Sequence, residues 1–224
     1  NNLNTGLLGI NIGPNKDSPN RLNDYLIGIQ KFHDIADYIT INISSPNTEN
    51  LRNFHDENKF DELMLSIEEE KNRLKSKIPI VVKISPDISE EQSNILSEIL
   101  LKHKVRAVII SNTTANNREK LKEILKYQKG GLSGKPIEEV SNELISRFYK
   151  LLKNKIEIIG VGGVDSGKSA YKKFLAGASF IQLYTGMVFQ GPSVVRKIKK
   201  ELKEILIDDG VKNFREIIGK KHTN

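Results

Sequence analysis

Six short runs of apolar, mostly β-branched residues are spaced along the chain. They are residues 8–12, 38–43, 78–84, 107–110, 156–161 and 180–183. Short, nearly continuous apolar runs are typical of strands that are buried on both faces of a parallel sheet. The pattern therefore predicts six parallel strands.

Segments with the 3.6-residue period of an amphipathic helix separate these runs. In residues 89–102, Ser89 is placed to cap the N-terminus, and Ile95, Ile99 and Leu100 form an apolar stripe. Three further segments show the same period, namely residues 137–152, 168–175 and 194–207. Strands and helices that alternate without a break in composition predict a single α/β domain.

Polar or glycine-rich residues follow every predicted strand at its C-terminal end. A (βα)8 barrel places its functional loops there, whereas a doubly wound sheet places one glycine-rich loop after its first strand. A complete barrel has eight strands in roughly 250 residues, but this chain shows six runs in 224 residues. We therefore predict a TIM (βα)8 barrel with about six of its eight βα units. Because Asn1 leads almost directly into the first run, we expect the N-terminal part to be absent.

Composition excludes several classes of site. The chain has no Cys, which excludes disulfides, thiolate metal sites and Cys nucleophiles, and its four His lack metal-ligand spacing. No apolar run is long enough to span a bilayer, and the first residues lack the features of a signal peptide. The net charge of +7 comes mostly from Lys interleaved with Glu, as on solvated helix faces, and aromatic residues make up only 6%. A nucleic-acid-binding module is therefore the weaker alternative.

Three glycine-containing loops are candidates for a phosphate site. They are residues 130–136 (GGLSGKP) before a helix, 160–164 (GVGGV) after a strand, and 184–186 (YTG) at the end of the last strand. Glycine lets backbone N–H groups approach a phosphate, and a helix N-terminus adds a favourable dipole. Each loop alone could be only a turn, but three converging loops favour phosphate binding.

Two further clusters could bind a planar polar ligand. In residues 42–48 (NISSPNT), Asn47 and Thr48 could donate hydrogen bonds and Ser45 could accept a proton, although an N-cap and turn would suit the same residues. Residues 112–114 (NTT) offer amide and hydroxyl groups or form a bend.

Lys83 lies inside the apolar third run. It must reach something polar, because burying an unpaired ammonium group is costly. Three interpretations remain open: a contact with a bound cofactor, a Schiff base as in an aldolase-like barrel, or an edge position from which the side chain reaches solvent.

Taken together, these motifs resemble the dihydroorotate dehydrogenase family. The resemblance rests on six collinear stretches: 42–48 (NISSPNT), 82–87 (VKISPD), 111–114 (SNTT), 130–136 (GGLSGKP), 160–164 (GVGGV) and 182–185 (QLYT). It extends from residues 9–13 to residues 218–219 and is closest to the quinone-dependent class 2 branch. Members of class 1 carry a catalytic Cys where this chain has Ser45.

The resemblance implies that residues 1–224 are the C-terminal portion of an FMN-binding barrel. Such a barrel oxidises dihydroorotate to orotate in UMP biosynthesis, with a quinone as electron acceptor. Ser45 would be the catalytic base, with Thr48 and water as a proton relay. The substrate would be bound by Asn42, Asn47, Asn112 and Thr113. The cofactor would be contacted by Asn11, Asn42, Lys83, Thr113, Ser133, Gly134, Gly162, Gly163, Tyr184 and Thr185.

The resemblance also sets expectations about partners and completeness. The family implies a peripheral membrane protein, on the cytoplasmic face of the inner membrane in a bacterium, with no nucleic-acid partner and no metal. Its barrel begins with two further strands, preceded by a helical segment that docks on the membrane and admits the quinone. We expect this chain alone to be inactive because it lacks them. The alternative function is another phosphate-binding (βα)8 barrel enzyme that uses Lys83 as a Schiff-base residue.

Overall fold

The computed structural model describes residues 6–45, 54–116, 118–119 and 121–222. Its six strands are β1 (Gly9–Ile12), β2 (Tyr38–Asn42), β3 (Ile80–Ile84), β4 (Ala107–Ile110), β5 (Glu157–Val161) and β6 (Phe180–Gln182). They form one sheet in sequence order, and every neighbouring pair is parallel. The six predicted runs are therefore confirmed as strands.

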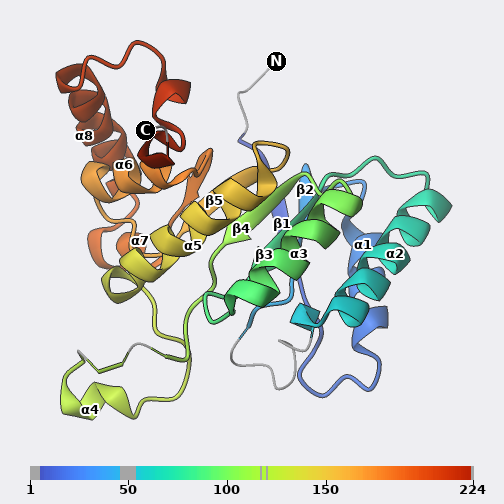
Figure 1. The fold of residues 1–224 in the computed structure, drawn as a ribbon. Helices are drawn as coiled ribbons and strands as arrows, with labels where there is room; N and C mark the ends of the chain where they lie inside the picture. The colour runs from blue at the N-terminus through green and yellow to red at the C-terminus, as the bar shows by residue number, and fades with distance from the viewer. Residues whose placement is uncertain (1–5, 46–53, 117, 120, 223–224) are drawn as a thin grey trace.

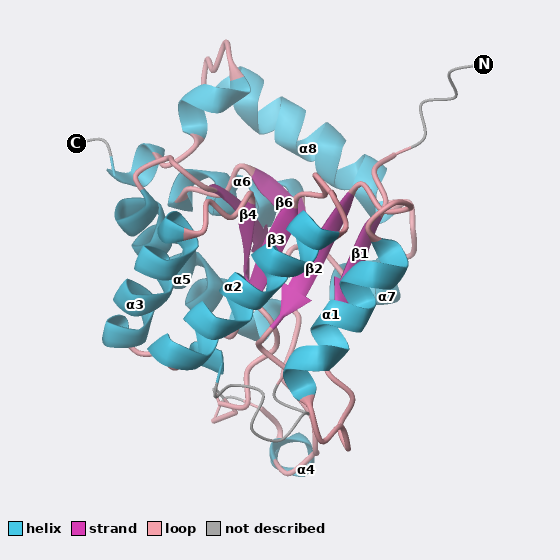
Figure 2. Cartoon of the chain, turned by 90° about the vertical axis from the view of Figure 1, so that its right-hand side faces the viewer, coloured by secondary structure: helices cyan, strands magenta, loops and turns pink. Residues whose placement is uncertain are grey.

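The sheet curls into a half-barrel, and helices cover its outer face (Figures 1 and 2). The longer helices are α1 (Arg21–Phe32), α2 (Glu57–Arg73), α3 (Glu90–Lys102), α5 (Glu138–Leu152), α6 (Gly167–Ala176) and α8 (Val194–Asp208). Shorter elements are α4 (Glu123–Lys126), α7 (Thr185–Gln190) and the 3-10 turns η2 (Lys135–Ile137), η3 (Phe214–Ile217) and η4 (Lys220–His222). Parallel strands in sequence order, joined by outer helices, are the arrangement of a TIM barrel. The predicted fold class is confirmed, with six strands in the described residues.

Two predicted helix details can be compared with α3. Ser89 accepts a hydrogen bond from the backbone of Gln92, whose side chain bonds back to the Ser89 N–H, so the predicted cap is a full capping box. The buried stripe differs slightly: Ile99 and Leu100 are buried as predicted, but Leu96 is fully buried while Ile95 packs at the margin.

The main core lies between the outer face of the sheet and the helices. Alternate strand residues such as Ile41, Val82 and Ile84 pack there against helix residues that include Phe60 of α2 and Phe148 of α5. The intervening strand residues point to the other face because strand side chains alternate. On that inner face, Val81, Ala107 and Ile109 form a separate, smaller apolar cluster.

The prediction that all six runs are buried on both faces is wrong at the two edges of the sheet. Leu8, just before β1, is 53% exposed, and Phe180 of β6 is 60% exposed. In the described residues, β1 and β6 each pair with one strand only, so no neighbour covers their other side.

The charged side chain of Lys173 on α6 is completely buried. Its Nζ donates to Ser141 Oγ and to Asn142 Oδ1, each at 3.0 Å. Ser141 Oγ in turn donates to the carbonyl of Val161 at 2.6 Å, at the end of β5. Burial lowers the pKa of Lys173 to about 7, and the neighbouring Glu138 carboxylate opposes that shift.

This buried lysine should make folding stability depend on pH. The unfolded chain, with an ordinary Lys pKa of 10.5, binds more protons than the folded protein from about pH 7 upward. The free energy of unfolding of the wild type should therefore rise relative to Lys173→Met as pH increases through this range. Urea unfolding of both proteins at about pH 7 and about pH 9.5 measures the difference. Lys172→Met, at a partly exposed neighbour, is the control, and a difference that does not change with pH would contradict the assignment.

Candidate functional site

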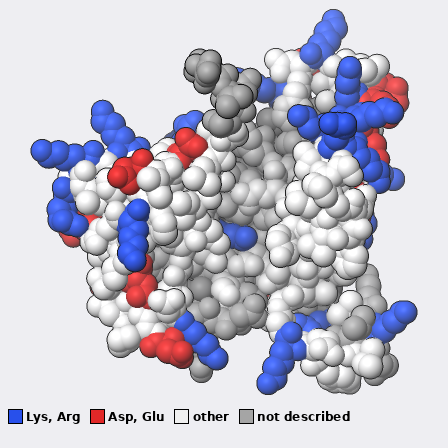
Figure 3. Space-filling view, turned by 180° about the vertical axis from the view of Figure 1, so that it is seen from behind, with Lys and Arg blue, Asp and Glu red and all other residues white. Residues whose placement is uncertain are grey.

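A cavity of about 610 Å³ lies at the C-terminal ends of the strands from β3 to β6. Figure 3 shows the molecule hollowed between its two lobes, with basic atoms at the bottom of the hollow. Nine of the predicted site residues line the cavity, namely Lys83, Asn112, Thr113, Ser133, Gly134, Gly162, Gly163, Tyr184 and Thr185. Residues from separate loops thus meet at one place, as the barrel prediction requires.

Lys83 reaches the cavity from the inner face of the half-barrel. It alternates with Val81, which belongs to the inner apolar cluster, and it pairs in register with Asn42 of β2. Burial lowers the pKa of Lys83. No hydrogen bond or ion pair to another described residue compensates its charge. The side chain is therefore suited to contact an anionic or carbonyl-bearing ligand.

The three predicted phosphate loops converge at the other end of the cavity. Thr185 Oγ1 donates to Ser133 Oγ at 2.9 Å. Gly134 and Gly163 both have φ of +75°, and a Cβ on Gly134 would lie 2.9 Å from Thr185 Cγ2. A Cβ on Gly163 would lie 2.5 Å from Glu138 Cβ. Only glycine fits such positions without displacement, so these backbones can approach Thr185 and Glu138 closely only because they lack a Cβ.

The loop of residues 130–136 lies at the cavity, although a long segment separates it from β4 in the sequence. The chain leaves β4, forms the projecting segment that contains α4 (Figure 1), and comes back through an antiparallel bridge between Thr114 and Leu132. Arg118 holds the excursion closed by donating to the carbonyl of Gln128 at 2.8 Å. The loop that begins at Gly130 is thereby placed beside the end of β4.

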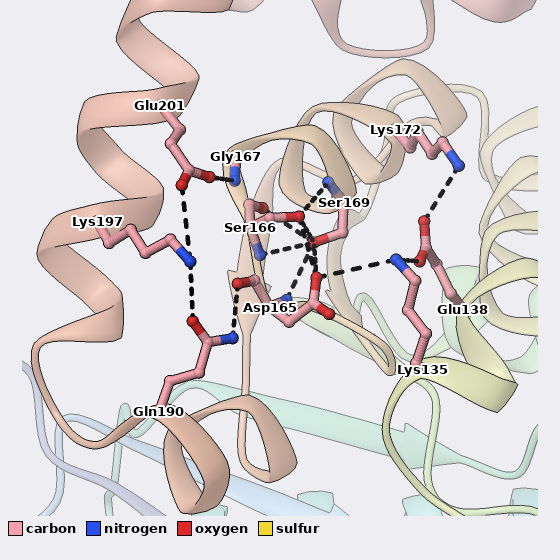
Figure 4. Close-up of polar contacts among 10 residues, drawn as sticks. All are labelled: Lys135, Glu138, Asp165, Ser166, Gly167, Ser169, Lys172, Gln190, Lys197 and Glu201. Carbon is pink, nitrogen blue, oxygen red and sulfur yellow. Dashed lines mark hydrogen bonds and ion pairs between the residues drawn. The ribbon is translucent and has the colours of Figure 1, made fainter.

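A network of ion pairs and hydrogen bonds links the glycine-containing loops to neighbouring helices (Figure 4). Glu138, which is buried, lies 2.5 Å from Lys135 Nζ and 3.3 Å from Lys172 Nζ. The hydrogen bond between the Lys135 ammonium group and the Glu138 carboxylate raises the pKa of Lys135. Lys135 also lies 3.9 Å from Asp165, and Gln190 of α7 donates to the Asp165 carbonyl at 3.0 Å. The loops before α5, before α6 and along α7 are thus linked.

Helix α8 anchors this network from outside. Lys197 donates to Gln190 Oε1 at 3.0 Å, and Glu201 accepts a hydrogen bond from the Gly167 N–H at 2.6 Å (Figure 4). Helix α8, which the sequence predicted, therefore helps to hold the start of α6 and the end of α7 in place.

A buried hydroxyl joins the side-chain amides of Asn42 and Asn112, both of which are predicted to bind the substrate. Ser44 Oγ donates to Asn42 Oδ1 at 2.7 Å and accepts from Asn112 Nδ2 at 2.9 Å. Tyr25, buried under the sheet, donates through its hydroxyl to the Asn42 carbonyl at 2.7 Å. The ends of β2 and β4 are connected in this way although β3 lies between them.

The other predicted site residues lie beside the cavity or outside the described residues. Asn11 and Asn42 do not line it, but both fall on the inner face, where Asn42 pairs with Lys83. Ser45 follows β2 and is half-buried, and it is not part of the lining either. Asn47, and Thr48 of the suggested relay, lie outside the described residues.

Residues 184–186 follow the last strand, as predicted, but they begin a short helix that was not predicted. Strand β6 ends at Gln182, and Tyr184 is the N-cap residue of α7, with its side chain 79% exposed. At six residues, α7 is too short to show a helical period.

Sequence reasoning missed several lining residues. Phe189 and Gln190 were missed because they lie on α7. Lys135 and Asp165 lie within or beside the glycine-rich motifs, which could have suggested them. Ser44, which does not line the cavity but joins Asn42 to Asn112, was also missed, because a buried hydroxyl between two amides has no signal in the sequence.

In the part of the chain that the structure describes, no group of His, Cys, Asp and Glu side chains could hold a metal ion. The described helices also include none with the length and apolarity to span a membrane.

Comparisons with known proteins identify the family. The dihydroorotate dehydrogenase profile matches residues 1–206. The chain is 41% identical over 215 residues to the dihydroorotate dehydrogenase (quinone) of Bartonella henselae, covering 94% of this chain and 59% of the relative. It is 45% identical over 201 residues to the enzyme of the same name from Hamiltonella defensa, covering 86% and 59%.

A solved structure agrees with these matches. The crystal structure of DHODH from Eimeria tenella in complex with ferulenol superposes with a TM-score of 0.92 at 33% identity, covering 97% of this chain and 63% of that one. The chain spans about 59% of the length of the two bacterial relatives. On the profile match, the identities and the superposition, the chain belongs to the dihydroorotate dehydrogenase family.

Proposed function

We propose that the protein containing this chain oxidises (S)-dihydroorotate to orotate, with FMN as cofactor and a quinone as electron acceptor, in pyrimidine biosynthesis. Family membership supports the reaction class. The observation that carries the proposal is the gathering of nine expected site residues around one cavity. In this proposal residues 1–224 are the C-terminal portion of a single catalytic barrel, and quinone entry and membrane attachment belong to a preceding segment.

The phosphate end of the cavity fits the phosphate of FMN. Gly134, Gly162 and Gly163 line this end of the cavity, and at each of them a Cβ would come within 2.5–3.0 Å of a neighbouring side chain. The Thr185 hydroxyl and the first turn of α7 face the same space. Backbone N–H groups with a hydroxyl are a donor set suited to a phosphate.

The other end of the cavity fits the ring system. Lys83 brings a desolvated positive charge to the cavity, and this charge can balance negative charge on a reduced cofactor. When bound, FMN supplies the hydride acceptor for the substrate. Asn112 and Thr113, which line the cavity, would hold polar edges of a planar ligand.

Proton removal is assigned to Ser45. A serine hydroxyl is a weak base, so the proton that it takes from C5 of the substrate must be passed on through a preorganised relay, for which Thr48 is the candidate. Asn42 and Asn47 complete the proposed substrate contacts.

The central test measures flavin reduction in the full-length protein. Dihydroorotate should bleach the flavin absorbance in anaerobic stopped-flow measurements, and Ser45→Ala should slow this step by about two orders of magnitude or more without changing FMN content. Ser66→Ala, on α2, is the control. Reduction of Ser45→Ala at the wild-type rate would contradict the role of the base. Trapping of a substrate on Lys83 by borohydride would instead favour the Schiff-base alternative.

Gly163→Ala should weaken FMN binding. Both the positive φ and the collision with Glu138 oppose a methyl group at this position. We expect a dissociation constant for FMN at least about tenfold higher, measured by flavin fluorescence. Gly210→Ala is a matched control, because Gly210 has φ of +64° but nothing within 4 Å of its would-be Cβ. Equal affinities in the two variants would show that the close approach at Gly163 does not matter.

Lys83→Met should lower the reduction potential of the bound flavin. Loss of the nearby positive charge destabilises the reduced, more negative cofactor, by about 30 mV or more. Lys77→Met is the control, because Lys77 precedes β3 at the opposite end of the strand. Spectroelectrochemical titration measures both variants, and an unchanged potential at full FMN occupancy would remove Lys83 from this role.

A further inference from the structure

Ser44 lies two residues after the end of β2, and its side chain is completely buried. It does not line the cavity, yet it contacts two residues that are assigned to the substrate. Its backbone N–H donates to Asn42 Oδ1 at 3.2 Å, in addition to the two hydrogen bonds of its hydroxyl. At the far side of Asn112, the Thr113 N–H donates to Asn112 Oδ1 at 2.8 Å.

The two backbone N–H groups fix the direction of this hydrogen-bond chain. A backbone N–H can only donate, so the Asn42 atom that faces Ser44 must be the oxygen, and so must the Asn112 atom that faces Thr113. The amide nitrogen of Asn112 then faces Ser44 Oγ and donates to it. The Ser44 hydroxyl hydrogen is left to donate to Asn42 Oδ1. One orientation of both amides satisfies all four hydrogen bonds.

This orientation determines what the amides can offer to a ligand. Among the described residues, both N–H donors of the Asn42 amide nitrogen and one of Asn112 have no hydrogen-bond partner. Both amide oxygens already accept hydrogen bonds from the chain itself. With the positive charge of Lys83 beside them, this part of the site offers donors and positive charge.

We infer that Ser44 is a positioning residue that turns the amides of Asn42 and Asn112 so that both present N–H donors. This selects a planar ligand edge that carries acceptors, such as a carboxylate or ring carbonyls. The inference rests on the proposed function, because the residues that Ser44 orients are those assigned to dihydroorotate and orotate. Ser44 itself touches neither ligand and acts through the two amides.

Removal of the hydroxyl would leave each amide held by one hydrogen bond instead of two. In Ser44→Ala, Asn112 Nδ2 loses its acceptor, and Asn42 Oδ1 keeps only the backbone donor. The amides could then rotate and present an oxygen to an acceptor edge, which is repulsive. Ser44→Thr keeps the hydroxyl and should keep the orientation.

Orotate binding to the FMN-loaded, full-length protein is the first test. We expect Ser44→Ala to raise the dissociation constant of orotate by about tenfold or more, with unchanged FMN content, and Ser44→Thr to recover most of the affinity. Ser85→Ala is the matched control, since Ser85 is equally buried, follows β3, and accepts a hydrogen bond from the Asp87 N–H. Wild-type orotate affinity in Ser44→Ala, or equal losses of affinity in Ser44→Ala and Ser85→Ala, would overturn the inference.

Hydrogen exchange of the Asn112 side-chain amide, followed by NMR, is the second test. One amide proton should be protected in the wild type, through its bond to Ser44, and should lose protection in Ser44→Ala. Fast exchange of both protons in the wild type would overturn the inference even if no variant folds. If the wild type binds no orotate, the proposed function fails, while the exchange result still decides the role of Ser44.

Discussion

The alternation of side chains along parallel strands is the constraint on which the rest of this structure depends. In β2 and β3, Ile41, Val82 and Ile84 point outward into the core beneath the helices. Asn42 and Lys83, one residue away in each strand, pair in register on the inner face. A shift of either strand by one residue would exchange the two sets, burying Asn42 or Lys83 among apolar side chains. The same packing that stabilises the sheet therefore also fixes its polar side chains at the cavity.

The structure of the glycine-rich end of the cavity depends on how closely backbone segments approach neighbouring residues. Gly134 and Gly163 bring their backbones against Thr185 and Glu138, at distances that leave no room for a Cβ. Burial of the Glu138 carboxylate is tolerated because Lys135 and Lys172 pair with it. These contacts hold the glycine-containing loops in place at the rim of the cavity.

The sequence predicts the strands well because their signal is local. Six apolar runs of high β-propensity mark β1 to β6, and the Ser89 cap marks the start of α3. The edges were harder, since the exposure of Leu8 and Phe180 depends on which strands lie beside them. Helix α7 was missed because six residues carry no clear period. These are consequences of tertiary structure rather than of local preference.

The sequence likewise indicated only some of the residues of the candidate site. Motifs in the sequence indicated the glycine loops and Lys83, because glycine and an isolated charge are unusual in their local context. The contact between Asn42, Ser44 and Asn112 joins residues 68 positions apart, and no local pattern reports it. Residue roles for Ser45, Asn47 and Thr48 came from the family resemblance, and Asn47 and Thr48 lie outside the described residues.

The two ends of the cavity differ in the positive charge that they offer to a ligand. At the glycine-rich end, the described cations at the rim are already paired: Lys135 is held by Glu138 and Asp165. That leaves backbone dipoles and a hydroxyl as the donors for an anion. At the other end, burial alone lowers the pKa of Lys83, so its positive charge is destabilised until a ligand supplies negative charge. By linkage, a ligand that raises the pKa of Lys83 is bound more tightly by the protonated form. Binding energy at this end is therefore greatest for a ligand, or a reduced cofactor, that carries negative charge beside Lys83.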